Sequence, residues 1–164
     1  MPVSCSAPGN YKVIDEMTSI EGFIPHRFPA RVIARLIEAD EEQALVEAEV
    51  PMQGRFVRDG AMPTWVGIEH MAQAIATWAG ARALRSGQPV RLGLLLGTRK
   101  LEIRRPTLPA GATLRIHARC EVLAANGLGL FECRITLGDE VVAIAAVSVF
   151  EPDDVSSYLG CNVS

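Results

Sequence analysis

A carboxylate and a cation stand fourteen residues apart in the stretch of this sequence best suited to chemistry. Residues 53–73 read QGRFVRDGAMPTWVGIEHMAQ and contain Arg55 and Glu69. A carboxyl group among apolar helical neighbours is suited to donate a proton as a general acid. Arg55 cannot accept a proton, because its guanidinium stays protonated over the usable pH range. The window therefore predicts a general acid, Glu69, whereas Arg55 cannot supply the base.

The three histidines are the alternative bases. His26, in the turn Ile24-Pro25-His26-Arg27, is the best placed of them to reach a site. His70 follows Glu69 directly, and successive helical residues point about 100° apart, so we expect His70 in the core or in an interface. His117 falls in a predicted strand and is expected to be structural.

A single long helix, over residues 65–85, must position Glu69. From Trp65 to Ala83 its only charged residues are Glu69 and Arg82. A helix that is apolar on every side should be wrapped by the rest of the fold. Thr64 is the expected N-cap residue.

The rest of the chain predicts strands. Two come before the helix, at 30–39 and 44–50, and four come after it, at 91–104, 112–123, 129–137 and 141–150. Turn residues join the last three, so the four later strands should form a meander. A short helix is expected at 13–22 and an irregular stretch at 51–63. The pattern favours an α+β fold, in which one antiparallel sheet of about six strands wraps round the helix.

Size and composition narrow the classes of function. The chain has 164 residues, which predicts one domain over 1–164 with a core at about 15–150. A net charge of −3 gives no reason to expect nucleic-acid binding. The basic segment Arg99, Lys100, Arg104 and Arg105 is either a solvated strand face or a docking patch for an acidic partner.

No membrane span, metal site or cofactor is predicted. No apolar run reaches the roughly eighteen residues that a span needs, and the N-terminus lacks the features of a signal peptide. The four cysteines form no CxxC pair and no metal-ligand spacing with the histidines, and Cys120 and Cys133 fall in apolar, strand-like runs. We therefore expect a cytoplasmic protein with reduced thiols.

Four motifs together resemble the 3-hydroxyacyl-acyl-carrier-protein dehydratases, and in particular their divergent aryl-polyene-cluster branch. They are Pro25-His26-Arg27, Gln53-Gly54-Arg55-Phe56, Glu69-His70-Met71-Ala72-Gln73, and Arg104-Arg105-Pro106 with Pro109-Ala110-Gly111. The resemblance covers about residues 15–150. It implies the hotdog fold and a dimer that acts on acyl thioesters carried by an acyl carrier protein.

The resemblance also assigns residues to roles. Glu69 matches the family's acid and Arg55 stands at the position of its catalytic histidine. Gln73 matches a residue that orients the acid, and Thr64 replaces a glycine at the helix entrance. Phe56, Thr64, Trp65 and Gln73 are the expected substrate-binding residues. Trp65, Met71 and Trp78 either line an acyl tunnel or belong to the core.

Three functions remain open from the sequence. The first is a lyase that dehydrates acyl-carrier-protein thioesters with an unusual base such as His26. The second is a catalytically impaired subunit that pairs with an active hotdog dehydratase and lends it Glu69. The third is an acyl thioesterase in which Glu69 activates water. All three predict a homodimer or a heterodimer with a related hotdog protein.

Overall fold

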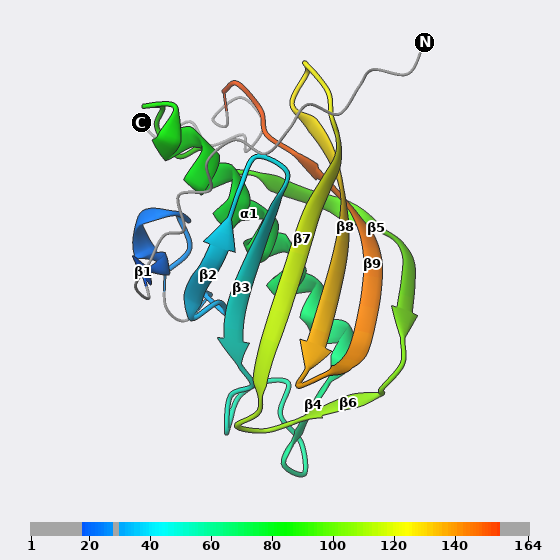
Figure 1. The fold of residues 1–164 in the computed structure, drawn as a ribbon. Helices are drawn as coiled ribbons and strands as arrows, with labels where there is room; N and C mark the ends of the chain where they lie inside the picture. Colours follow the sequence, from blue (N-terminus) through cyan, green and yellow to red (C-terminus); the bar gives the residue numbers. More distant parts are fainter. Residues whose placement is uncertain (1–17, 28–29, 155–164) are drawn as a thin grey trace, which may run out of the picture.

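A curved antiparallel sheet wraps one long helix in the computed structural model, which describes residues 18–27 and 30–154 (Figure 1). The main sheet has the strand order β1-β2-β3-β7-β8-β9-β5. Its strands are β1 (Thr18–Ser19), β2 (Arg35–Ala39), β3 (Gln43–Glu49), β5 (Leu94–Ile103), β7 (Thr113–Leu123), β8 (Leu128–Leu137) and β9 (Glu140–Phe150). The expected α+β hotdog architecture is confirmed.

The helix α1 (Gly67–Arg85) lies across the concave face of the sheet (Figure 1). Its buried side chains include Met71, Ala74 and Trp78, which pack with strand residues in one hydrophobic core. At Gly80 the helix backbone approaches the segment before β2, because an added Cβ would lie 1.8 Å from the carbonyl oxygen of Phe23. The helix is therefore embedded on several sides, as its apolar sequence predicts.

The start of the helix differs from the expectation. Residues Thr64–Val66 form a 3₁₀ turn (η2), and α1 begins only at Gly67 with Val66 as its N-cap. The Thr64 hydroxyl donates its hydrogen bond to the carbonyl oxygen of Arg105 instead of to a helix amide. The prediction of Thr64 as the cap of the long helix was wrong, because the bend between β5 and β6 (Thr107–Pro109) supplies its partner.

Two short strands escaped the sequence analysis. β4 (Ala61–Pro63) lies in the stretch expected to be irregular, and it pairs with β6 (Thr107–Pro109) in a separate two-stranded sheet. Three-residue strands that contain proline carry no alternating apolar pattern. The strand expected at 30–39 corresponds to β2, which begins only at Arg35. Of the expected helix at 13–22, residues 18–19 form β1, residues 20–22 form a 3₁₀ turn (η1, Ile20–Gly22), and 13–17 lie outside the described residues.

The order of the later strands also differs from a simple meander. β7, β8 and β9 are joined by hairpins as expected, but β5 pairs with β9 and not with β7. β5 is thus an edge of the main sheet. Among the large hydrophobic side chains that remain exposed, Leu95, Leu96 and Ile103 all lie on it.

Candidate functional site

Glu69 is held in place by Gln73, one turn further along α1. The Gln73 side-chain amide donates a hydrogen bond of 2.8 Å to Glu69 Oε1. The same amide donates to the carbonyl oxygen of Ala30, and its oxygen accepts from the N–H of Val32, each at 2.8 Å. Gln73 is fully buried, whereas Glu69 is exposed in the single chain. Gln73 therefore fixes the orientation of the carboxylate, which stays accessible to a ligand.

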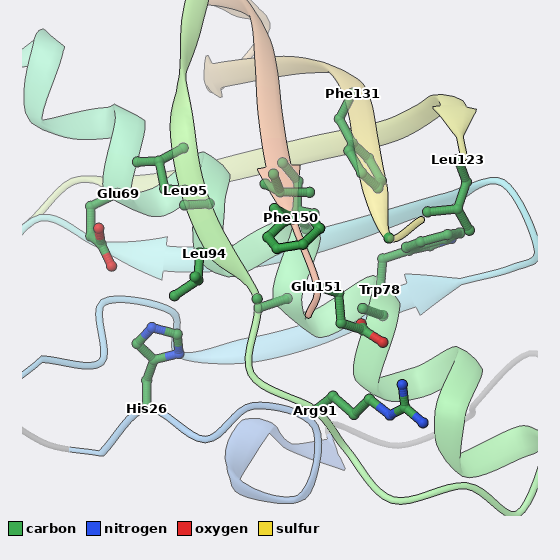
Figure 2. Close-up of a pocket in the computed structure, with 17 residues that line it drawn as sticks. His26, Glu69, Trp78, Arg91, Leu94, Leu95, Leu123, Phe131, Phe150 and Glu151 are labelled. Carbon is green, nitrogen blue, oxygen red and sulfur yellow. The ribbon is translucent and has the colours of Figure 1, made fainter. Parts of the chain in front are cut away.

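Glu69 lines a cavity of about 120 Å³ beside the helix. Figure 2 shows Glu69 and His26 at one side of this cavity and Trp78 and Leu123 at the other. Most of the wall between them is apolar: Ala72, Ile75, Ala76, Ala79, Leu94, Leu95, Phe131, Val149 and Phe150. The arrangement suits an apolar chain whose reactive end lies against a carboxylate.

His26 lines the same cavity as Glu69, so the structure brings two of the sequence-predicted residues together. Its ring is partly buried, and Nδ1 is covered without a hydrogen-bond partner among the described residues. Nε2 is thus the ring nitrogen left to face a ligand. A charged imidazolium would have no acceptor at Nδ1, which makes His26 a poorly supported base.

Arg55 lies apart from Glu69. Its side chain is exposed, it does not line the cavity, and within the described residues it forms no ion pair or hydrogen bond. Phe56 and Trp65, which were expected to bind substrate, are also exposed and outside the cavity lining. Their rings meet edge to face with centroids 5.6 Å apart. In a single chain, these three residues are surface residues and do not belong to the cavity wall.

The remaining sequence candidates are structural in position. Thr64 is buried at the helix entrance and also donates its backbone N–H to the carbonyl oxygen of Pro106. His70 is 2% exposed, and burial lowers its pKa, with the Val66 carbonyl acting in the opposite direction. His117 lies on β7, 2.8 Å from the Gln43 side-chain oxygen, and burial lowers its pKa as well. Met71 is in the core, whereas Trp78 lines the cavity.

The sequence analysis missed most of the cavity wall. Leu94, Phe131 and Phe150 come from three different strands, and each lies at least 25 residues from Glu69 in the chain. Apolar residues in strands are ordinary core candidates, and no local pattern marks those that border an open space. Only the facing positions of the helix, Ala72, Ala76 and Ala79, carry a signal, because small residues recur there at helical spacing.

Neither a metal site nor a membrane span is found in the part of the chain that the structure describes. No three side chains among its histidines, cysteines, aspartates and glutamates come together to hold an ion. No described helix combines the length and apolarity that crossing a bilayer requires.

The basic segment is partly paired: Arg104 forms a salt bridge with Glu102 at 2.6 Å and Arg105 forms one with Glu140 at 3.2 Å.

Comparison with known proteins places the chain among dehydratases. The family described as ApeP-like, ApeP dehydratase, matches residues 18–160. A curated relative, the 3-hydroxyacyl-[acyl-carrier-protein] dehydratase FabZ of Desulforamulus reducens, is 32% identical over 137 residues. These cover 79% of this chain and 92% of the relative.

Solved structures give the same fold. A chain of the dehydratase heterocomplex ApeI:P from Xenorhabdus doucetiae superposes with a TM-score of 0.80 at 25% identity, covering 90% of this chain and 99% of that one. The PaaI protein of the E. coli phenylacetic acid degradation operon has a TM-score of 0.56 at 18% identity, over 71% and 81% of the two chains. The second likeness concerns the fold alone.

Proposed function

The chain belongs to the ApeP-like dehydratase family, and on that premise we propose that it supplies the acid half of a dehydratase site. The substrate is a 3-hydroxyacyl thioester on an acyl carrier protein. Glu69 protonates the departing 3-hydroxyl, which leaves as water. A base on a partner hotdog subunit removes the proton at carbon 2, so that a double bond forms between carbons 2 and 3.

The observation that carries this proposal is the setting of Glu69. Its carboxylate lies at one side of an apolar cavity and receives a hydrogen bond from the buried amide of Gln73. Gln73 is itself fixed by two backbone groups, of Ala30 and Val32. A proton donor held in this way beside an apolar chain-binding space meets the geometric needs of the reaction.

The base is assigned to a partner because this chain offers a poor one. Arg55, at the family's histidine position, is permanently protonated. His70 is buried in the core, and His26 has no acceptor for Nδ1 among the described residues. Losing a general base typically costs a factor of about 10² to 10⁴ in rate. A homodimer of this chain should therefore be a weak dehydratase.

Two features support a dimer as the working form. β5 is an edge strand that carries three exposed large hydrophobic side chains, and such an edge is suited to pair with another sheet. The similar structure from Xenorhabdus doucetiae is a dehydratase heterocomplex. A related hotdog dehydratase that keeps its histidine is the partner that fits this chain.

The test compares three samples on a 3-hydroxyacyl-carrier-protein thioester: this chain alone, a histidine-bearing hotdog dehydratase of the same organism alone, and the two together. We expect the mixture to exceed the sum of the separate rates, and Glu69→Gln in this chain to remove the gain. The matched control is Glu49→Gln, an exposed glutamate at the end of β3. A mixture that keeps its gain with Glu69→Gln would refute the acid role. Thiol release that depends on Glu69, without dehydration, would favour the thioesterase.

One observation favours a second candidate, a self-sufficient dehydratase. His26 lines the same cavity as Glu69 within one chain, so an acid and a base could face one substrate without a partner. In that case the chain alone turns over, and His26→Gln abolishes the activity. A chain that is inactive alone but active in the mixture rules this candidate out.

A further inference from the structure

A second hollow of about 340 Å³ adjoins the cavity at the end away from Glu69. The two spaces share six lining residues: Trp78, Ala79, Arg91, Leu123, Gly127 and Glu151. Figure 2 shows Trp78, Arg91 and Glu151 at this far side of the first cavity. The path that starts at the carboxylate therefore does not end at Trp78 but continues past it.

Alanines of α1 recur along this path, between the larger helix side chains Ile75, Trp78 and Arg82. Ala72, Ala76 and Ala79 line the first cavity, and Ala79 and Ala83 line the second hollow. With a rise of 1.5 Å per residue, Ala79 lies about 15 Å and Ala83 about 21 Å beyond Glu69 along the helix axis. At these positions a larger side chain would narrow the path.

The walls of the two spaces differ in polarity. The first is mainly apolar, whereas the second contains two arginines and two acids: Arg91 and Glu151, which border both spaces, and Arg82 and Asp153, which line the second alone. Arg91 pairs with Asp153 at 3.3 Å, and the Arg82 guanidinium carbon lies 5.4 Å from the centre of the Trp78 ring. Because the positive and negative groups balance, the second hollow suits a neutral hydrogen-bonding group better than a carboxylate or a bare alkyl end.

We propose that the acyl chain bound at Glu69 passes Ala79 and places a neutral polar end group, such as a hydroxyl, in the second hollow. The inference rests on the proposed function, since it takes the first cavity as the acyl site. Carbon 3 lies at Glu69, and a staggered chain advances about 1.25 Å per carbon, so roughly twelve further carbons span the distance to Ala79 and only an acyl chain longer than about fifteen carbons passes it. Ala79 is then a residue that determines chain-length specificity.

Leucine substitutions along the helix test the path. The affinities of hexanoyl, decanoyl and octadecanoyl pantetheine thioesters are measured by calorimetry with the full chain. We expect Ala72→Leu to weaken all three, and Ala79→Leu to weaken octadecanoyl binding at least about tenfold while leaving hexanoyl binding unchanged. Alanine and leucine both favour helices, so these variants should fold. Ala34→Leu, exposed and outside both spaces, is the control.

The end group is tested with an octadecanoyl thioester that carries a terminal hydroxyl. We expect it to bind about five- to tenfold more tightly than the methyl-ended thioester. Ala83→Leu, which intrudes on the second hollow only, should abolish this preference. The proposal is overturned if Ala79→Leu leaves octadecanoyl affinity unchanged, or if the methyl-ended probe binds as tightly as the hydroxyl-ended one.

These probes lack the 3-hydroxyl, so their binding does not depend on dehydration. If the mixed complex fails to dehydrate the thioester but the leucine variants show the expected dependence of affinity on chain length, the proposed reaction is wrong and the proposed acyl path is supported. If dehydration depends on Glu69 but the series shows no length dependence, the reaction stands and the channel past Ala79 is wrong.

Discussion

Glu69 and Arg55 are fourteen residues apart in the sequence, and both are exposed, but they differ in how their side chains are supported. Glu69 belongs to an embedded helix and is bonded to Gln73, which is anchored to the backbone of the segment before β2. Arg55 lies in an exposed loop, where the described residues offer its side chain no partner. Glu69 is thus held by an anchored hydrogen-bond partner, whereas the side chain of Arg55 is held by none among the described residues. The difference supports a subunit that contributes one half of a shared site.

The largest effect expected on the helix side comes from Gly80→Ala. The added methyl group would lie 1.8 Å from the Phe23 carbonyl oxygen, so helix and neighbouring segment must move apart. We expect the free energy of unfolding in urea to fall by about 2–3 kcal/mol. Gly22→Ala, where no atom lies within 4 Å of the new methyl group, should change it little. Equal losses in the two variants would show that the helix is not closely packed at Gly80.

Gln73→Leu removes the support beneath Glu69. Two backbone groups, of Ala30 and Val32, lose their partner, and the carboxylate loses its hydrogen bond. We expect a loss of about 2 kcal/mol in unfolding free energy and a fall of at least about tenfold in the dehydration rate of the mixed complex. Arg55→Leu, the matching change on the loop side, should alter stability by less than about 0.5 kcal/mol. A larger loss of unfolding free energy in Arg55→Leu than in Gln73→Leu would show that the loop, and not the helix, carries the supported side chain.

A smaller, pH-dependent effect is expected from His70. Burial lowers the pKa of the folded histidine below its ordinary value of 6.5. Below pH 6.5 the unfolded chain therefore binds a proton that folded His70 does not, so stability falls on acidification by up to about 1.4 kcal/mol per pH unit. Unfolding free energies at pH 7 and pH 5.5 should differ by about 1 kcal/mol less in His70→Leu than in the wild type. The same difference in both proteins would mean that His70 takes up its proton in the folded state.

The long helix and the main strands were predictable, because alternation and all-round apolarity are local signals. The strands β4 and β6 were not, since each has three residues, one of them a proline. The family resemblance, with Gln73 one helical turn after Glu69, predicted that Gln73 would accompany Glu69. The partners of Gln73 at Ala30 and Val32, more than forty residues away, could not be read from the sequence.

Thr64 shows the same limit. Its sequence context predicted a helix cap, but a contact with Arg105 across the fold supplied its partner. The cavity wall follows the same rule, because Phe131 and Phe150 meet the helix only through the order of the strands. Sequence reasoning proposed Glu69 as the reactive residue, and the tertiary structure determined the cavity beside it.

The most direct test of the central claim is the dehydration rate of this chain alone, as wild type and as Arg55→His. If only the base is missing, the wild type alone should be nearly inactive, and Arg55→His should raise its rate by about 10² or more, with the gain lost in the double variant with Glu69→Gln. A wild-type chain that dehydrates the thioester efficiently by itself, or an Arg55→His variant whose gain survives Glu69→Gln, would contradict the account.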